Sequence, residues 1–477
     1  MMIRERGRKV QRVSSLSPVS SPQDLQFPDD AFRRVQPEPL ATRPFHVPRV
    51  QTFELDGGIE VYLVEQHVLP IVQIQLDVDG GSILDPPDRT GLASAMTSML
   101  SEGTERLDKI AYAEALADVA SSITTSAGDD SFTISLASLT EHLDRTVALF
   151  IETLRTPGFR RTDFERLIKR RIESVRQSRS SPQSIPSRVM GRILYGADHP
   201  YGAVLTESSL TAIELDDCRT LAARWLRPDG ARLFVVGDID EARVRALFGS
   251  EQLGSGAPPP MPTLPAPATL PGRHFFVHAP GATQAQVSYM QHGPARSDPG
   301  YLANALLGAI LGGGFASRLN MNLRESRGLS YGVRGGFSYS RSCGMLTAGG
   351  PVHGTAAAEA VAQIELEIRD LALATRPATM DELEREKQGA ILALPGRFAT
   401  AQAALGQYRG LVYYGLPLDY YEDYAERIAA VTLHDIAHAA ATELRPDEGC
   451  FLVVGDAPVG EGDVTTLDVD GVGLPRR

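Results

Sequence analysis

An alternation of apolar and polar residues begins shortly after His46. Residues 51–65 and 69–78 are rich in β-branched side chains, and Asp56-Gly57-Gly58 interrupts the first of these runs. Successive side chains of a strand point to opposite faces, so an alternating run broken by an Asp-Gly turn is typical of a β-hairpin. The pattern therefore predicts paired strands at the start of a folded domain.

The alternation then gives way to helical periodicity. Residues 90–103 are predicted to form a helix, since Leu92, Ala93, Met96 and Leu100 recur on one face together with Met99. Further along, the pattern predicts strands at 131–139 and 231–236 and helices at 141–156, 162–178 and 213–226.

Two stretches lack any such period. Residues 1–45 are rich in Ser, Pro, Gln and Arg, which predicts a disordered leader. Residues 251–272 are dominated by Pro and Gly, which indicates a linker between domains. After the linker, strands are predicted at 274–278 and 285–291. These boundaries predict domains at 46–250 and 273–457, followed by a tail at 458–477.

The two halves of the chain resemble each other. Short segments recur around Lys169 and Lys387, Pro228 and Pro446, and Gly237 and Gly455, and each pair is separated by 218 positions. A repeat of this length indicates a duplicated domain, because solenoid units are about 20–50 residues long. Each half runs strand, strand, helix, strand, helices, strand, which favours α+β domains with a largely antiparallel sheet flanked by helices.

Length, charge and cysteine content exclude some classes of function. The chain has 477 residues, which predicts two or three domains, and its formal net charge of -12 disfavours binding to nucleic acid. Its three cysteines, Cys218, Cys343 and Cys450, lie far apart, so they make a poor disulfide framework and a poor zinc-thiolate site.

Targeting signals are equally sparse. No run of about 18 apolar residues is present, so no membrane span is expected. The basic stretch Met1–Val13 is not followed by an apolar segment, so it is not a secretory signal as it stands. We therefore expect a cytoplasmic bacterial protein, or a periplasmic one if the true start differs.

Several motifs point to a family. Residues 80–85, 90–100 and 102–104, followed by Asp198-His-Pro-Tyr-Gly202, resemble the N-terminal domain of the M16 (pitrilysin-like, inverse-zincin) metallopeptidases. With the duplication, the resemblance extends from about residue 48 to about residue 457. It implies a clamshell half of two related domains, as in the insulinase-like and the two-subunit, processing-peptidase-like enzymes.

Active members of that family carry HxxEH on the first helix. Histidines at i and i+4 share a helix face and bind zinc, and the glutamate acts as general base. Here Ser94, Thr97 and Ser98 occupy these positions, and Glu173 falls near the position of the third ligand. Hydroxyl groups are poor zinc ligands, so we expect no metal bound by this chain. Nothing in the spacing suggests Ser94 or Ser98 as a nucleophile, and Glu173 is expected to pair on a helix surface with Lys169 or Arg170.

The second half retains a different family motif. Residues 312–319 and 323–331 match a Ser-Arg-Leu helix followed by Leu-Arg and Gly-Leu-x-Tyr. The resemblance implies that Arg324 and Tyr331 hold the peptide and stabilise the oxyanion of its hydrolysis. The residues alone favour a helix-surface charge for Arg324 and the start of a strand at 331–339 for Tyr331, and it is the resemblance that favours the functional role.

The glycines Gly312, Gly313 and Gly314 open this motif. No Lys-Ser or Lys-Thr pair follows them, so they are not a phosphate loop. They indicate either a turn into a helix or a loop that contacts a bound peptide.

One further pattern resembles a metal site. His434 and His438 lie at i and i+4, with Asp435 beside the first. The duplication places this segment opposite residues 216–220 of the first half, which favours a structural outer helix. No third ligand is evident.

These observations leave three hypotheses. The leading one is a zinc-lacking subunit, inactive alone, that forms a heterodimer or a dimer of heterodimers with an HxxEH-bearing paralogue. The partner would hold zinc, and Arg324 and Tyr331 would assist hydrolysis of short or unfolded peptides. The alternative is a peptide-binding or assembly scaffold with no role in hydrolysis. The third is a metal enzyme that uses His434 and His438.

Overall fold

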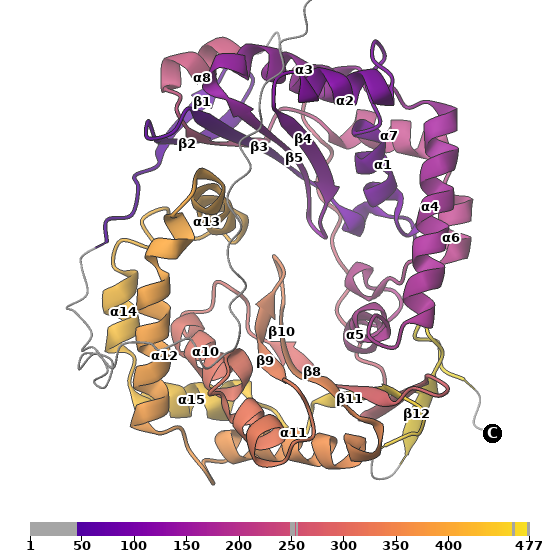
Figure 1. Ribbon diagram of the computed structural model, residues 1–477, viewed down its shortest axis with the longest axis vertical. Coiled ribbons are helices and arrows are strands. Elements are labelled where there is room, and N and C mark those ends of the chain that lie inside the picture. The colour runs from indigo at the N-terminus through magenta and orange to yellow at the C-terminus, as the bar shows by residue number, and fades with distance from the viewer. Residues whose placement is uncertain (1–44, 249–252, 254–255, 460–462, 475–477) are drawn as a thin grey trace, which may run out of the picture. The chain divides into compact units, whose positions relative to one another are not determined.

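The computed structural model describes residues 45–248, 253, 256–459 and 463–474. Its first half is built on a six-stranded sheet in the order β1-β2-β6-β3-β5-β4, in which only β2 and β6 pair in parallel (Figure 1). The strands are β1 (Gln51–Leu55), β2 (Ile59–Glu65), β3 (Ile71–Asp79), β4 (Ser122–Ala127), β5 (Ser131–Leu139) and β6 (Arg232–Gly237). The helices are α1 (Leu92–Leu100), α2 (Lys109–Ala117), α3 (Leu143–Arg155), α4 (Arg161–Ser180), α5 (Ile185–Tyr195), α6 (Glu207–Ala212), α7 (Leu215–Trp225) and α8 (Glu241–Leu247).

The second half repeats this plan with the order β12-β7-β11-β8-β10-β9. Its strands are β7 (His274–His278), β8 (Gln284–Gly293), β9 (Arg334–Tyr339), β10 (Gly344–His353), β11 (Cys450–Gly455) and β12 (Val464–Leu467). Its helices are α10 (Tyr301–Gly308), α11 (Ala357–Ala372), α12 (Met380–Ala393), α13 (Ala401–Tyr413), α14 (Tyr424–Ala430) and α15 (Leu433–Glu443), with the π-helical turns η7 (Ala309–Gly313) and η8 (Asn320–Ser326).

The duplication is visible in the register of equivalent strands. β6 begins at Arg232 and β11 at Cys450, which is again a separation of 218, and both strands lie third in their sheets. At the edge, β12 takes the place of β1, although it pairs in parallel where β1 pairs antiparallel. This strand falls within the segment 458–477 that was expected to be a tail. The predicted α+β fold with two duplicated, mainly antiparallel domains is confirmed.

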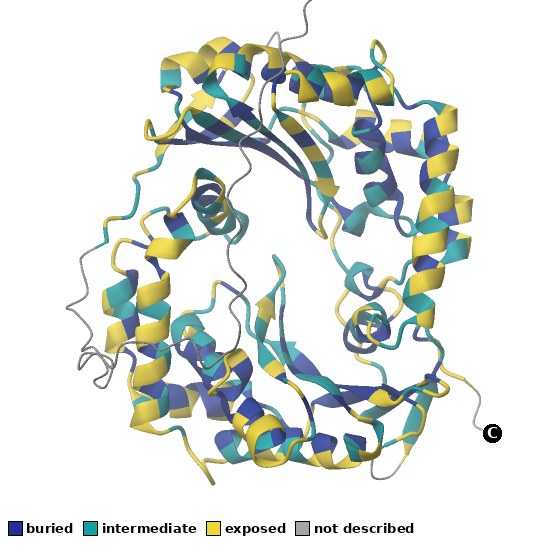
Figure 2. Cartoon of the chain, in the orientation of Figure 1, coloured by how far each residue is buried: buried dark blue, intermediate teal, exposed yellow. Residues whose placement is uncertain are grey.

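Local patterns account for most of these elements. β5 and β7 have the predicted bounds, and the Asp56-Gly57-Gly58 turn joins β1 to β2 with Leu55 opposite Ile59. Every residue on the predicted apolar face of α1 is buried. Figure 2 shows the same rule throughout, with buried faces of helices against the sheets and exposed faces outward. Burial of these apolar faces supplies the main driving force for the fold.

Each half also lends a helix to the sheet of the other. Apolar residues of α5, including Val189 and Ile193, pack with Phe275 and Leu452 of the second sheet. The duplicated counterpart of α5 is α13, which packs against β6 and β3 of the first sheet (Figure 1). This exchange ties the halves together through apolar burial.

Polar contacts reinforce the exchanged helix α13. Its Arg409 pairs with Asp77 of β3 at 2.6 Å, and Tyr413 donates a 2.6 Å hydrogen bond to Asp130. Tyr201 donates to the same carboxylate at 2.7 Å. Asp130 therefore joins two hydroxyls that are far apart in the sequence.

The remaining sequence expectations concern cysteines and membrane spans. All three cysteines are free thiols, and Cys218 and Cys450 are buried. Among the helices of the described residues, none is long and apolar enough to cross a membrane. The leader predicted at 1–45 lies almost wholly outside the described residues.

Candidate functional site

The helix α1, which carries the altered HxxEH segment, is held at its beginning by a carboxylate. Asp85 accepts hydrogen bonds of 2.7 Å from the backbone N–H groups of Gly91 and Ala93. Gly91 adopts a left-handed backbone conformation, with φ at 101°, which glycine enters without steric cost. Burial raises the pKa of Asp85 to about 6, and this effect outweighs the two hydrogen bonds that favour its charged form. The first turn of α1 is thereby fixed.

Thr97 stands where active relatives place their general base. Its side chain is buried, and its hydroxyl donates to the carbonyl oxygens of Ala93 at 3.1 Å and Ser94 at 3.2 Å. Thr125 of β4 in turn donates to the Thr97 carbonyl at 2.6 Å. The hydroxyl of Thr97 is thus directed into its own helix, where it cannot activate a water molecule.

A cation lies at the positions that correspond to the zinc-binding histidines of active M16 enzymes. The Nη2 of Arg171, from α4, donates 2.7 Å hydrogen bonds to the carbonyl of Ser94 and to the hydroxyl of Ser98. Burial lowers the pKa of Arg171, yet arginine stays charged near neutral pH. A guanidinium therefore bridges the two residues that stand in place of the metal-binding histidines.

Sequence reasoning missed Arg171, although the signal was present. Leu167, Arg171 and Val175 are spaced four residues apart, and both apolar members of this row are buried. An arginine on the buried row of an amphipathic helix indicates a specific buried contact.

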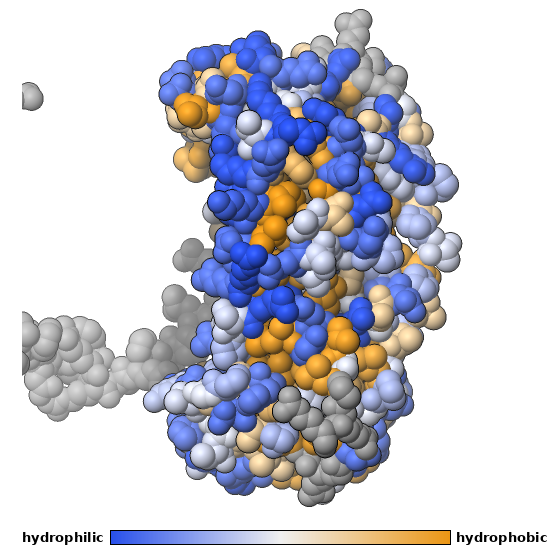
Figure 3. Space-filling model, turned by 90° about the vertical axis from the view of Figure 1, so that its right-hand side faces the viewer, coloured by the Kyte–Doolittle hydropathy of each residue, from blue (hydrophilic) through white to orange (hydrophobic). Residues whose placement is uncertain are grey.

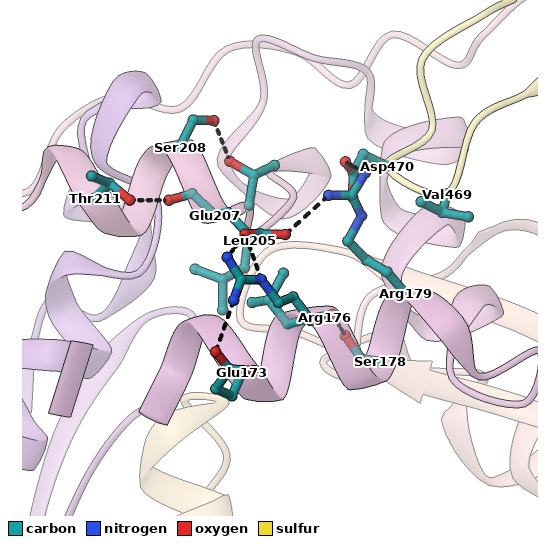
Figure 4. Close-up of polar contacts among 12 residues, drawn as sticks. Glu173, Arg176, Ser178, Arg179, Leu205, Glu207, Ser208, Thr211, Val469 and Asp470 are labelled. Atoms are coloured by element: carbon teal, nitrogen blue, oxygen red, sulfur yellow. Dashed lines mark hydrogen bonds and ion pairs between the residues drawn. The ribbon is translucent and has the colours of Figure 1, made fainter. Parts of the chain in front are cut away.

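Glu173 does not join this cluster. Its side chain is 59% exposed and pairs with Arg176 at 2.8 Å, so the predicted partners Lys169 and Arg170 were wrong. Arg170 lies instead 3.5 Å from Glu102. Figure 4 shows that Glu173 belongs to a surface network in which Arg176 pairs with Glu207 of α6 at 2.8 Å. The expected third-ligand position is thus a surface ion pair.

The residues of this site do not fit a zinc ion. Ser94 and Ser98 offer neutral hydroxyls, Glu173 is directed into the surface network, and the positive charge of Arg171 repels a metal cation. Within the described ranges, no group of three or more His, Cys, Asp or Glu residues could hold a metal. No step of a reaction can be assigned to a metal in this chain.

In the second half, Gly312 and Gly313 are the last two residues of η7, and Gly314 follows it. A Cβ atom on Gly312 would lie 2.3 Å from the backbone nitrogen of Gly335, so this glycine permits close packing against β9. Gly313 and Gly314 are exposed, and a Cβ on Gly314 would meet no atom within 4 Å. Close packing thus explains Gly312, whereas Gly313 and Gly314 form an open surface.

A buried amide fixes the shape of this region. Asn320 donates to the carbonyls of Gly314 at 2.9 Å and Val333 at 2.7 Å, and it accepts from the N–H of Val333 at 3.0 Å. Ser330 adds a 2.6 Å bond to the carbonyl of Pro351. Asn320 therefore holds the loop that carries Tyr331 against η8, and Ser330 holds it against β10. Tyr331 precedes β9 by three residues, so it does not begin the strand.

Arg324 and Tyr331 are presented outward from this anchored region. The Arg324 side chain is 41% exposed, contacts Glu325 at 3.2 Å and lies 4.7 Å from the ring centre of Phe315. Tyr331 is 89% exposed, and its hydroxyl bonds to no residue of the described ranges. Phe315 is 60% exposed and was not anticipated from the sequence. All three side chains are thus exposed, and Phe315 lies against Arg324.

The histidine pair of α15 has another explanation. His434 and His438 are exposed, and Asp435 accepts the N–H of Thr432 at 2.8 Å in a helix capping box. Asp435 therefore closes the start of α15, and no third ligand accompanies the pair in the part of the chain that the structure describes.

Comparison with known families agrees with this geometry. A profile described as "Insulinase (Peptidase family M16)" matches residues 60–193, and one described as "Peptidase M16 inactive domain" matches residues 212–390. The chain belongs to peptidase family M16. It is an inactive, M16-like member, since the positions of the catalytic motif hold Ser94, Thr97 and Ser98.

Individual relatives are similar to most of the chain. A Helicobacter pylori protein named non-peptidase homolog YmxG is 24% identical over 402 residues, which cover 83% of this chain and 92% of that protein. A Bacillus subtilis protein named uncharacterized zinc protease YmxG is 21% identical over 352 residues, covering 71% and 82%. A crystal structure of a peptidase M16 inactive domain from Pseudomonas fluorescens superposes with a TM-score of 0.79 at 24% identity, over 87% of this chain and 99% of that one, which shows a shared fold.

Proposed function

We propose that this chain is the zinc-lacking subunit of a two-chain M16 metallopeptidase. Its partner is an HxxEH-bearing paralogue that holds the zinc ion, and this chain contributes Arg324 and Tyr331 to the shared site. The observation that carries the proposal is the contrast between the halves. In the first half, the guanidinium of Arg171 bonds to Ser98 at the position of a zinc-binding histidine. In the second half, Arg324 and Tyr331 are exposed on a region that Asn320 anchors.

The chemistry of the two side chains suits this role. The tetrahedral intermediate of peptide hydrolysis carries an oxyanion, and preorganised donors stabilise it. The Tyr331 hydroxyl is free of other hydrogen bonds among the described residues, so it can donate to an oxyanion. The Arg324 guanidinium offers several donors to a peptide carbonyl. Phe315 stacks on Arg324 and limits its conformations, which reduces the entropy lost on binding.

A reconstitution assay tests the proposal. Cleavage of internally quenched peptides is measured with this chain alone, with the HxxEH paralogue alone and with both, and zinc is quantified in each sample. The proposal predicts cleavage by the mixture only, with zinc in the paralogue. Arg243→Ala is a suitable control variant, since Arg243 forms an exposed ion pair with Asp144 on α3. Cleavage by this chain alone would refute the proposal.

The scaffold alternative makes a different prediction in the same assay. The name of the Helicobacter pylori relative, non-peptidase homolog, agrees with a role without hydrolysis. A scaffold would form a stable complex with the paralogue and leave its cleavage rate unchanged. A complex that cleaves no faster than the paralogue alone would therefore favour assembly over catalysis.

A further inference from the structure

The guanidinium of Arg171 forms no ion pair with an Asp or Glu of the described residues. The carboxylate of Asp85, which acts on it electrostatically, is bonded to the first turn of α1. The other neighbouring group is the thiol of Cys218, and burial raises its pKa to about 12, so it is neutral at pH 7. Arg171 thus carries a positive charge in a partly buried position, and the one carboxylate that acts on it, that of Asp85, bonds to the backbone of α1 instead of to the guanidinium.

The hydrogen bonds of Arg171 are also incomplete. Its Nη2 is used by Ser94 and Ser98, but its Nε is buried without any acceptor in the described structure. Its Nη1 donates to none of the described residues. Leaving a desolvated charge unpaired is costly, so such a group usually meets a counter-charge supplied from elsewhere.

An open pocket lies directly beside this group. It has a volume of about 440 Å³, and its polar lining comprises Ser98, Arg170, Arg171, Ser174, Ser178 and Arg188. No Asp or Glu lines it. Arg188 pairs with Asp470 at 2.6 Å, and Arg170 lies 3.5 Å from Glu102. Among the three arginines of the lining, Arg171 is therefore the one that forms no ion pair with a described carboxylate.

The helix that forms one wall is itself basic. α4 carries seven Arg or Lys residues against three Asp or Glu residues, in a chain whose net charge is -12. Figure 3 views the side of the molecule that carries α4, where hydrophilic residues surround patches of apolar ones. The local potential therefore favours an anion, against the trend of the whole chain.

We propose that this pocket binds an oxyanion, a carboxylate or a phosphate, through the guanidinium of Arg171 and the hydroxyl of Ser98. Arginine forks match both anions, and hydrogen bonds between charged partners are about twice as strong as neutral ones. Ser98 accepts from Arg171, so its own proton is free to be donated to the ligand. Where active relatives hold a cation, this chain holds a site for an anion. The inference is independent of the role of Arg324 and Tyr331.

Thermal unfolding of the full chain provides the test. Inorganic phosphate and acetate are each titrated, with sodium chloride added to a control at equal ionic strength, because screening alone changes stability. The expected result is a rise of the melting temperature by about 3 °C or more with phosphate or with acetate, and no rise with chloride. The anion that raises the melting temperature is the one that the pocket binds.

Variants identify the pocket as the site. Arg171→Met retains the apolar stem of the side chain, and Ser98→Ala leaves the helix intact, so at least one of them is expected to fold. Each should lower the affinity for the anion by about tenfold or more. Arg176→Met is the matched control, because Arg176 lies on the same helix but is paired with Glu173 and Glu207. It should retain the full shift.

Two results would overturn the proposal of an anion site. If neither phosphate nor acetate raises the melting temperature above the chloride control, the pocket is not an anion site. If the shift persists unchanged in Arg171→Met or in Ser98→Ala, the anion binds elsewhere and the proposal fails.

Discussion

Arg171 donates a 2.7 Å hydrogen bond to the hydroxyl of Ser98, the residue at the position of the second zinc-binding histidine of active M16 peptidases. The position of the metal site thus lacks the metal-binding side chains and also holds a fixed positive charge. This relationship makes the loss of metal binding a property of two helices, α1 and α4.

Restoring the motif alone should not restore zinc. In the triple variant Ser94→His, Thr97→Glu, Ser98→His, we expect substoichiometric zinc, because Arg171 repels the ion and Glu173 remains in its surface ion pair. Adding Arg171→Ala should raise the zinc content. Elemental analysis after dialysis measures both, and a full equivalent of zinc in the triple variant would contradict this account of the site.

The buried carboxyl of Asp85 should make stability depend on pH. Its pKa is raised to about 6 in the folded chain from its ordinary value of 3.8, so the folded state binds the proton more tightly. The contribution of Asp85 to folding stability therefore falls as pH rises from about 4 to about 6, by about 2–3 kcal/mol, and changes no further above that window.

The variant Asp85→Asn isolates this effect. The asparagine does not titrate. As the pH rises through this window, the free energy of unfolding of the wild type should therefore fall relative to that of the variant. Urea denaturation at several pH values measures the difference. A difference that stays flat between pH 4 and pH 6 would show that Asp85 titrates normally.

The contact between Arg409 and Asp77 should stabilise the chain strongly. Asp77 is 4% exposed, so Arg409→Met leaves a buried carboxylate without its ion pair and should lower the free energy of unfolding by about 3 kcal/mol. Adding Asp77→Asn should recover part of this loss. Arg243→Ala, in an exposed ion pair, should change stability by less than about 0.5 kcal/mol. Equal effects of the two arginine variants would refute the argument.

The amide of Asn320 should hold the Tyr331 loop in place. Asn320→Ala leaves the buried N–H and carbonyl of Val333 without partners and should cost about 2 kcal/mol or more. The neighbouring exposed residue Met321 offers a control, and Met321→Ala should be nearly neutral. Hydrogen exchange should show faster opening around Val333 in the first variant alone; unchanged protection there would contradict this role.

The local parts of the fold followed from the sequence because short-range rules decide them. The Asp-Gly turn, the apolar face of α1 and the bounds of β5 and β7 each depend on residues within one element. The duplication was visible because equivalent segments keep a constant separation. The contacts between distant elements were not predicted from the sequence. Examples are the exchange of α5 and α13 and the pairing of β12 with β7.

The site shows the same division. The absence of zinc ligands was read directly from Ser94, Thr97 and Ser98. The position of Arg171 was not, because its contact with Ser98 joins residues 73 apart in the chain. The π-helical turn η8, which shapes the surface around Arg324, likewise has no simple periodic signature. Partners of charged surface residues, such as that of Glu173, depend on rotamers that sequence spacing alone does not fix.

The most direct test of the central claim is the steady-state kinetics of the reconstituted two-chain complex with Tyr331→Phe or Arg324→Ala in this chain. The exposed positions of both side chains predict unchanged assembly and unchanged stability. If both donors act in the shared site, kcat/KM should fall by about 10²–10³, with Tyr331→Phe acting on kcat, while Arg243→Ala retains full activity. Full activity of both variants in an intact complex would contradict the account, because the zinc-bearing partner would then need nothing from Arg324 or Tyr331.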